Sequence, residues 1–284
     1  MDKFTAYLPL IITVLVFLMK LLLGFNTRAS HLRYFMHKGS LLFRSLVAAL
    51  IIPPLLAIIL VNIFHPGIIV SAALLLLSAA PGAPLAAMKA YKYEGSYAFG
   101  ISLEIILITL SVITLPLSLE VFNRYFDLEL AANWLELSRQ IFLVIVLPLI
   151  IGFSIGLVKP SWVEKYGMKA GKMVNILLLL FTLPMLWVFR EAFLRLGPMD
   201  YLMFIVFVLI LYLLGHYSAG NNRSDRITLA VLSSSRHVGI CLFIAIGSFE
   251  KYEFLNVLVP YLIVSIVLGI IYDKITPEST SQNS

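Results

Sequence analysis

The chain has 284 residues, of which 61% are hydrophobic and only 13% are charged, with a net charge of +6. A soluble domain carries roughly 25% charged residues, so this composition excludes a water-soluble protein. With a mean hydropathy of +0.98, it predicts an all-α polytopic membrane protein. The positive charges are few and are separated by long apolar runs, which indicates an orientation signal and not a nucleic-acid-binding surface. The single cysteine, Cys241, excludes an internal disulfide framework and a cysteine-rich metal site.

About nine membrane spans are predicted along the chain. A spanning helix needs ~20 mostly apolar residues, because lipid offers no partner for an unpaired backbone amide. The first apolar run, from Tyr7 to Phe25, is too long for the apolar region of a signal peptide, and no small-x-small cleavage site follows it, so it is expected to be the first span. The expected spans are about 5–24, 40–64, 66–92, 95–120, 135–158, 166–190, 197–218, 225–249 and 252–273.

The Lys and Arg residues between these spans predict the orientation of the chain, because cytoplasmic connections carry an excess of them. One side of the predicted membrane carries most of these residues, including Arg28, Arg33, Lys38, Lys159 and Arg223, and the other side carries few. The N-terminus is therefore expected outside and the C-terminus in the cytoplasm. The polar tail at 275–284 is expected to be disordered.

Two of the expected spans are interrupted by residues that disfavour a continuous helix. The third contains Pro-Gly-Ala-Pro at 81–84, and the eighth contains the polar run from Ser233 to His237. The breaks occupy similar places in two groups of four spans within one membrane domain, about 5–120 and about 166–273, joined by a linker helix at 135–158. A single linker span makes the second group enter the membrane from the opposite side. This pattern predicts an inverted repeat with a transporter's binding site at mid-membrane; the alternative is a pair of ordinary proline kinks.

Two charged residues, Glu104 and Arg236, lie far from the ends of their expected spans. At 1.5 Å per residue they lie roughly 14 and 16 Å deep, where each costs about 2.5–3.5 kcal/mol. Their equal depth and opposite charge indicate that they meet or that both face one aqueous cavity. One interpretation is a structural ion pair. In the other, Arg236 holds an anionic substrate with its planar fork, while Glu104 neutralises it in the empty state or carries a proton.

The residues beside these two charges allow both structural and functional interpretations. His237 either titrates near physiological pH or bonds a carbonyl freed by the break. Ser234 and Ser235 either satisfy unwound backbone or line the site. No nucleotide-binding loop, metal motif or hydrolase motif is present, and Ser235 and His237 point to different helix faces. An enzyme, a cofactor and a metal site are therefore not expected.

Two segments resemble the crossover regions of the bile acid:sodium symporter family. They are LLLSAAPGAPLAAMKAYKYEGSYAFGISL (75–103) and LAVLSSSRHVGICLFIA (229–245). The resemblance implies a core of spans 2–4 and 7–9, in which two broken helices cross at mid-membrane. It also implies a panel of spans 1, 5 and 6, with substrate in the crevice between panel and core and sodium behind the crossover.

The resemblance places the family's sodium ligands on residues that do not suit sodium. The expected serine–asparagine pair falls on Ala86 and Ala87, which have no side-chain oxygen. Hydroxyl ligands fall on Gly100 and Glu104, the glutamate falls on Leu232, and the glutamine falls on Arg236. A fixed positive charge repels sodium, so a divergent member is expected, in which Arg236 stands in for the missing cation and Glu104 is its counter-charge.

The leading functional hypothesis is a secondary transporter of small organic anions that works by alternating access. It would be proton-coupled or facilitative and not sodium-coupled, and a bacterial inner membrane is the expected location. The alternatives are a sodium symporter with rearranged ligands and a non-transporting sensor or partner subunit of the same fold. The expected partners are the anion and the lipid bilayer, without nucleic acid. The residues expected to bind or couple substrate are Arg236, Glu104, His237, Ser234, Ser235, Pro81, Gly82 and Pro84.

Overall fold

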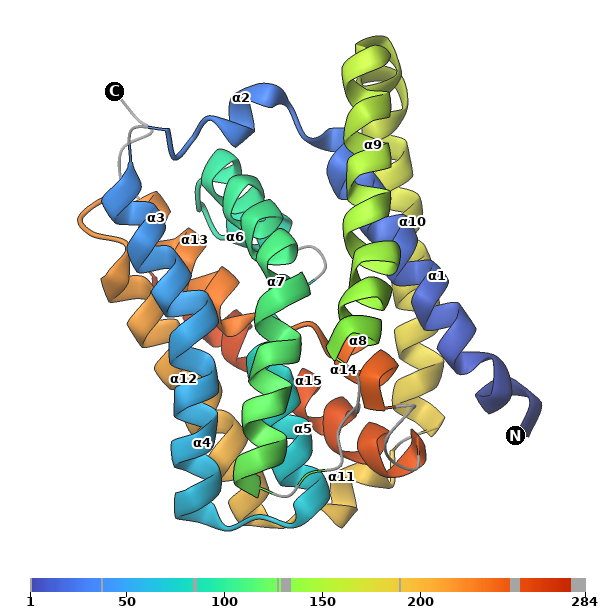
Figure 1. Cartoon of the computed structure of the whole chain (residues 1–284), viewed down its shortest axis with the longest axis vertical. Coiled ribbons are helices and arrows are strands. Elements are labelled where there is room, and N and C mark those ends of the chain that lie inside the picture. Colours follow the sequence, from blue (N-terminus) through green and yellow to red (C-terminus); the bar gives the residue numbers. More distant parts are fainter. Residues whose placement is uncertain are drawn as a thin grey trace.

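The computed structural model describes residues 2–36, 38–83, 86–126, 128, 134–188, 190–245 and 251–276, and these residues form helices and connections without a strand. Figure 1 shows their arrangement. In chain order the elements are α1 (Asp2–Asn26), α2 (Ala29–Leu32), α3 (Gly39–Leu46), the π-helix η1 (Val47–Ile51), α4 (Ile52–Phe64), α5 (Ile68–Ala79), α6 (Ala86–Lys92), α7 (Tyr97–Phe126), α8 (Trp134–Ile141), the π-helix η2 (Phe142–Val146), α9 (Leu147–Val158), α10 (Pro160–Val188), α11 (Ala192–Arg195), α12 (Pro198–Ser218), α13 (Arg223–Ser234), α14 (Val238–Ala245) and α15 (Lys251–Ile275).

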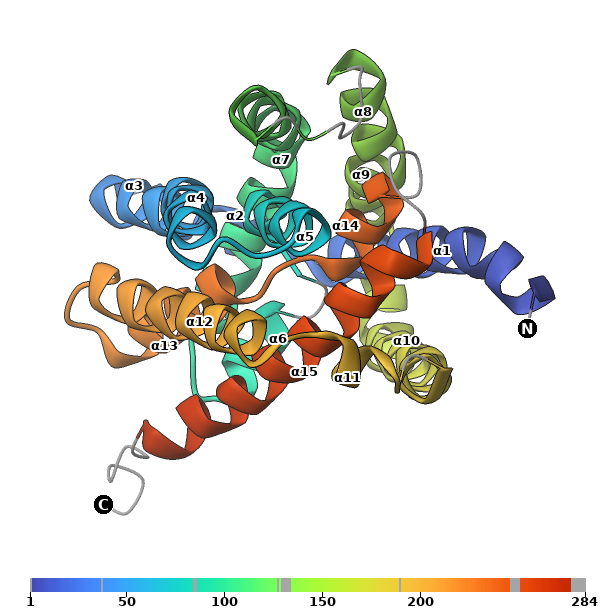
Figure 2. The same cartoon turned by 90° about the horizontal axis from the view of Figure 1, so that it is seen from below.

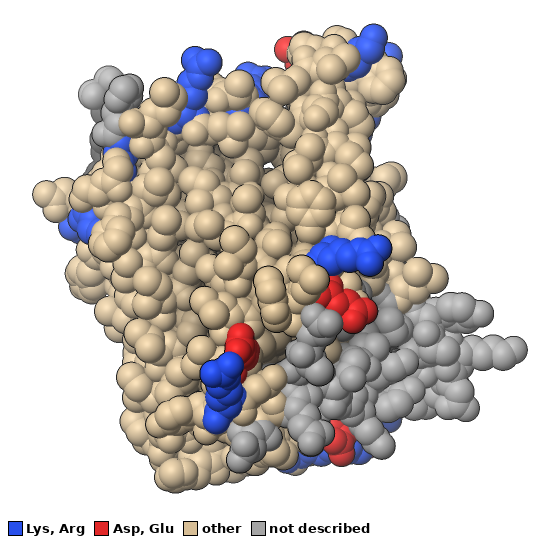
Figure 3. All heavy atoms as spheres, viewed as in Figure 1, with Lys and Arg blue, Asp and Glu red and all other residues tan. Residues whose placement is uncertain are grey.

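Five helical segments in the described part of the chain are long and apolar enough to cross a membrane. They are Gly39–Phe64, Tyr97–Phe126, Trp134–Val158, Pro198–Ser218 and Glu253–Ile275, and the shorter apolar helices are Thr13–Asn26 and Ile68–Ala79. Many large apolar side chains on these segments are exposed, such as Ile63, Ile113 and Val158. Figure 3 shows Lys and Arg side chains at the end of the molecule that carries α2 and the C-terminal end of α9, above a broad surface with few charged side chains. Such a surface suits lipid, as expected for an all-α membrane protein.

Two helices are interrupted, and their breaks touch each other. α5 ends at Ala79 and α6 begins at Ala86, while α13 ends at Ser234 and α14 begins at Val238. The backbone amide of His237 donates a hydrogen bond of 3.0 Å to the carbonyl of Ala80, so each break supplies a partner to the other. Figure 2 shows the connection between α13 and α14 passing close to α5.

Helices α1, α9 and α10 pack on one another beside the remaining helices, and we call these three the panel. Glycines bring α1 and α9 into backbone contact. A Cβ at Gly24 would lie 2.0 Å from the carbonyl oxygen of Leu149, and one at Gly152 would lie 1.9 Å from that of Leu21. Small residues allow such close packing of helices in lipid, where no hydrophobic force drives the helices together.

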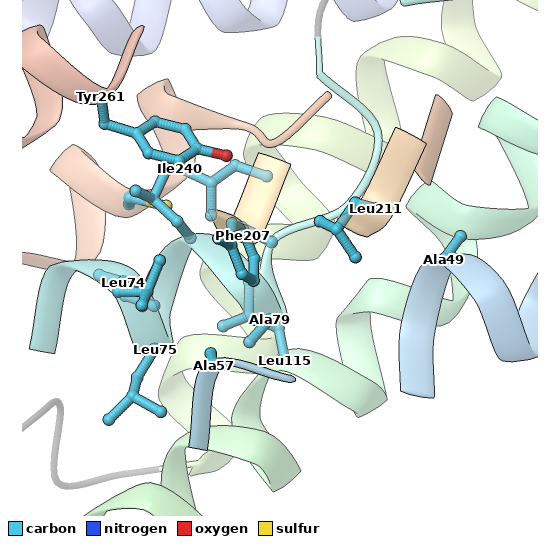
Figure 4. Packing of buried hydrophobic residues seen from close by; sticks show 14 of the residues in the cluster. Ala49, Ala57, Leu74, Leu75, Ala79, Leu115, Phe207, Leu211, Ile240 and Tyr261 are labelled. Carbon is cyan, nitrogen blue, oxygen red and sulfur yellow. The ribbon is translucent and has the colours of Figure 1, made fainter. Parts of the chain in front are cut away.

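The helices on the other side, α3–α7 and α12–α15, form the core bundle around an apolar interior. Figure 4 shows buried side chains from several of these helices that belong to one apolar cluster, including Leu74, Leu75, Phe207, Ile240 and Tyr261. The Tyr261 ring meets that of Phe204 edge to face at 5.6 Å between centroids, a favourable arrangement for two aromatic rings. The two broken helices therefore cross inside a packed interior.

Several helix ends differ from those expected from hydropathy. α10 begins at Pro160 and not near 166, and α7 continues to Phe126. Pro is well suited to the first position of a helix, and the polar turns that follow Pro160 extend α10 beyond its apolar stretch. The short helices α2 and α11 in the connections were not predicted. The expected disordered tail lies mostly at 277–284, outside the described residues.

The close contact between α1 and α9 predicts an asymmetric response to alanine. Gly152→Ala places a methyl group against the α1 backbone, so we expect it to destabilise the protein by about 1–3 kcal/mol, the usual effect of overpacking. Gly171→Ala in α10 is the control, because a Cβ there would meet nothing within 4 Å. The measurement is the thermal unfolding midpoint of the purified protein in detergent, and equal midpoints for the two variants would contradict the packing described.

Candidate functional site

The Arg236 side chain lies where the two breaks cross and is only 4% exposed. It follows α13 and reaches two other elements of the core bundle. Its Nη1 donates to the carbonyl oxygens of Ala49 (3.0 Å) and Ser78 (3.2 Å), and its Nη2 donates to that of Ser233. The guanidinium group thus joins η1, α5 and α13 through three backbone carbonyls.

Each of these carbonyls lacks a helical donor for an identifiable reason. Pro53 and Pro54 stand four and five residues after Ala49, and proline has no amide hydrogen. Ser78 lies in the last turn of α5, where carbonyls have no partner within the helix. Ser233 loses its helical donor because the amide of His237 bonds Ala80 instead. A cation is favoured at this point, because the negative ends of α5 and α13 both meet there.

Glu104 is paired with Lys20, so the direct contact with Arg236, one of the two arrangements expected for these charges, is not formed. The Lys20 Nζ lies 3.3 Å from Glu104 Oε1, and both residues are 1% exposed. Arg236 forms no ion pair within the described residues, because backbone carbonyls surround its guanidinium group. The two buried charges at similar depth therefore belong to separate clusters.

The break between α5 and α6 completes the environment of this ion pair. Lys20 Nζ also donates to the carbonyl of Gly82 at 2.9 Å, and the amide of Ala87 donates to Glu104 Oε2 at 3.2 Å. Gly82 has a φ angle of +73°, a conformation that glycine adopts without steric cost. The predicted break thus contributes a backbone carbonyl, that of Gly82, which binds the ammonium group of Lys20.

Lys20 was not identified from the sequence as a site residue. It lies near the C-terminal end of the first expected span, from where a lysine can extend its ammonium group to the membrane surface. The sequence did contain a signal for a buried charge there, because Lys20 is the one charged residue in the run from Tyr7 to Phe25. The structure shows that its ammonium group points to Glu104 and not to the surface.

A small crevice of about 60 Å³ lies between the panel and the core bundle and includes the ion pair in its lining. α1 and α10 line one side, and α6 and α7 line the other. Its polar lining residues are Lys20, Asn26, Tyr97 and Glu104, and its walls are otherwise mostly apolar. The crevice therefore offers one buried pair of opposite charges in an apolar surrounding.

The other predicted site residues lie in the crossover and do not line this crevice. The Ser234 hydroxyl donates to the carbonyl of Ala230 at 2.8 Å, and Ser235 is the buried, extended residue at the end of α13. The Nδ1 of His237 accepts from the amide of Ile240 at 3.2 Å. Pro81 is buried in the first break, and Pro84 lies outside the described residues. The His237 ring therefore bonds an amide of α14 and not a freed carbonyl, and the Ser234 hydroxyl bonds a carbonyl within α13.

The crossover also holds polar atoms without a hydrogen-bond partner among the described residues. They are the Nε of Arg236, the Nε2 of His237 and the hydroxyl of Tyr261, all of them buried. A buried polar atom without a hydrogen-bond partner is costly. These atoms are therefore available to donate or accept further hydrogen bonds.

Comparison with protein families identifies the chain. The model of the sodium bile acid symporter family matches residues 13–194, more than half of the chain. The chain belongs to the sodium bile acid symporter family. The matched region contains Lys20, Gly82 and Glu104, and it ends before Arg236. No curated protein matches the chain.

Membership confirms the resemblance found in the sequence. This family consists of transporters and not of enzymes, so transport is the class of function that membership implies. Together with the apolar helices described above, it confirms an all-α integral membrane protein.

The contacts of Arg236 predict its contribution to stability. In Arg236→Gln the three carbonyls lose their charged donor, so we expect destabilisation of about 2–5 kcal/mol from buried polar groups without partners. Arg124→Gln is the control, because Arg124 pairs with Glu120 at the exposed surface, where such a pair contributes less than about 1 kcal/mol. Thermal unfolding of the two purified variants measures the difference. An Arg236→Gln variant as stable as the control would show that the carbonyl cluster needs no cation.

Proposed function

We propose that this protein is a secondary transporter of small organic anions that works by alternating access without sodium coupling. The observation that carries the proposal is the presence of two tethered cations at the two breaks. The Lys20 ammonium group lies against Glu104 and Gly82, and the Arg236 guanidinium group lies against the carbonyls of Ala49, Ser78 and Ser233.

Both cations lie beside positions on which the resemblance places sodium ligands. Lys20 neighbours Glu104 and the start of α6, where Ala86 and Ala87 replace residues with side-chain oxygens. Arg236 itself replaces a glutamine of the family pattern. Hard cations such as sodium need several oxygen ligands, and a fixed ammonium or guanidinium group competes for the same oxygens. This favours sodium independence over a symporter with rearranged ligands.

For Arg236 the geometry favours the role of a permanent cation over direct contact with substrate. Its Nη1 and Nη2 groups already donate to carbonyls, and it does not line the crevice. Lys20 is the better candidate for holding an anion, because it does line the crevice. The charge that balances Glu104 is thus Lys20 in this proposal.

The order of elements supports an inverted repeat of nine spans. α1, α3–α4, α5–α6 and α7 would form the first group, α8–α9 the linker, and α10, α12, α13–α14 and α15 the second. The broken helix is third in each group. Interrupted helices at corresponding positions of the two halves are typical of transporters with inverted repeats. The panel of α1, α9 and α10 would then move against the core bundle.

The proposed orientation has the N-terminus outside and the C-terminus in the cytoplasm of a bacterial inner membrane. The charged end that carries α2 (Figure 3) would face the cytoplasm. The crevice is lined by the C-terminal part of α1 and the N-terminal part of α7, so it would open toward the same side.

The crevice lining indicates the class of substrate. Apolar walls, formed by residues such as Met19, Leu23 and Ile101, surround the Lys20–Glu104 pair. A ligand with an apolar body and one carboxylate or sulfonate group matches both features, because the body replaces water against the walls and the acid group meets the ammonium.

Ligand-dependent stability tests this proposal. A ligand that binds only the folded state raises the unfolding midpoint, so we expect amphipathic organic monoanions to raise it equally in sodium and choline buffers. Shifts that require sodium would favour a symporter with rearranged ligands. Binding without uptake into proteoliposomes would favour a sensor or partner subunit.

The role of Lys20 has its own test. Lys20→Met should abolish the shift caused by these anions, because the variant lacks the positive charge in the crevice. Lys89→Met is the matched control: Lys89 bonds the Tyr212 hydroxyl at 3.2 Å and does not line the crevice. An unchanged anion shift in Lys20→Met would remove Lys20 from the site.

A further inference from the structure

The Lys20–Glu104 ion pair joins the two parts of the protein that alternating access would move. Lys20 belongs to α1, which packs along α9 through Gly24 and Gly152, so it belongs to the panel. Glu104 belongs to α7 in the core bundle. Gly82, the second partner of Lys20, lies in the break between α5 and α6, which also belongs to the core bundle. The contacts of Arg236, in contrast, all lie within the core bundle. The movement of the panel that alternating access requires would therefore separate Lys20 from Glu104 and leave the contacts of Arg236 intact.

Separation leaves two buried charges that each need a new partner. Removing one partner of a buried ion pair costs about 3–5 kcal/mol, because the other charge stays buried and uncompensated. A carboxylate in an apolar site reaches neutrality by taking up a proton. An ammonium group instead needs an anion, and an anionic ligand in the crevice meets that need without any change in the protonation of Lys20.

We propose that the Lys20–Glu104 pair couples anion transport to proton transport: the acid group of the substrate replaces Glu104 at Lys20 while Glu104 takes up one proton. This inference rests on the proposed anion transport and specifies its coupling. Before binding, the site holds Lys20 as ammonium and Glu104 as carboxylate. After binding, it holds Lys20 as ammonium, the anion, and Glu104 as carboxylic acid. One anion and one proton enter together, so the net charge of the loaded site equals that of the empty site.

Among the groups around the pair, Glu104 is the one that we expect to take up the proton. From α6, the amide of Ala87 donates to its carboxylate, and from α7 itself Tyr97 lines the same crevice. His237, in the second break, accepts from the amide of Ile240 through its Nδ1. From α10, Gly171 lines the crevice and brings no charge. Glu104 is the one carboxylate in the described lining of the crevice.

Proton movement with a permanently anionic probe tests the coupling. Naphthalene-2-sulfonate stays ionised at all relevant pH values, so it carries no proton across the bilayer by itself. We expect its uptake into proteoliposomes in choline buffer to acidify the lumen, one proton for each probe molecule, as a trapped pH indicator reports. Because the pair of ions is neutral, an imposed membrane potential should leave the rate unchanged. Where Glu104 is ionised in the empty site, acidifying the outside should raise apparent probe affinity about tenfold per pH unit, as linkage to one proton requires.

Glu104→Gln provides the specific variant, because glutamine has nearly the shape of the protonated acid and cannot release the proton. It should still bind and move the probe, without lumen acidification, with a response to pH below about twofold and with a new dependence on membrane potential. Glu120→Gln is the matched control: Glu120 lies on the same helix and also forms an ion pair, with Arg124 at the surface. It should behave as the unmodified protein. If Glu104→Gln fails to fold, the proton count of the unmodified protein still decides whether anion and proton move together, and the absence of proton movement would overturn the coupling.

The possible results separate the two proposals. Probe uptake by the unmodified protein without lumen acidification, or proton movement that persists in Glu104→Gln, would overturn the coupling and leave anion transport standing. If the probe neither raises the unfolding midpoint nor enters the proteoliposomes, the proposed transport of such anions is contradicted, and the coupling with it. Uptake with one proton per probe that is lost only in Glu104→Gln would establish the coupling.

Discussion

The structure depends on how the carbonyl groups at the helix breaks are satisfied inside a membrane. Lipid provides no hydrogen-bond donors, so an interrupted helix at this depth requires donors from the protein. Arg236 supplies them to Ala49, Ser78 and Ser233, and the amide of His237 supplies one to Ala80. The two broken helices are thereby joined to each other and to η1. The packed core bundle, and with it the position of Glu104 on α7, is built around this crossing.

The two buried cations have different mechanical positions. Arg236 contacts carbonyls of the core bundle alone, so its charge stays in place whatever the panel does. Lys20 belongs to the panel and reaches across to Glu104 and Gly82, so the proposed movement of the panel would break its contacts. A fixed cation suits the replacement of an ion that only stabilises the crossing. In the proposed alternating access, a cation that spans the interface between panel and core would suit exchange with a ligand, because the movement would require the pair to separate.

Much of the fold was predictable because hydropathy and helix-breaking residues act locally. The apolar runs marked the main helices, and Pro81 and Gly82 marked a break whose backbone does bind a charged group. Pro53 and Pro54 likewise mark a local disruption of a helix. Their second effect, an unpaired carbonyl at Ala49, needs a donor from a residue far along the chain, and sequence spacing does not reveal that donor. The start of α10 at Pro160 was also missed, because polar residues there lower the hydropathy without ending the helix.

The sequence by itself determined the membrane class, the family, the two breaks and the presence of buried charge at Glu104 and Arg236. These follow from composition, from local backbone chemistry and from depth along a helix, which is 1.5 Å per residue. The tertiary structure alone decided which charges meet. Depth gives one coordinate, along the membrane normal, and the partner of a charge depends on the other two, in the membrane plane. Those are set by how α1 packs against α9 and α7 against α6, and they place Glu104 beside Lys20 and Arg236 among carbonyls.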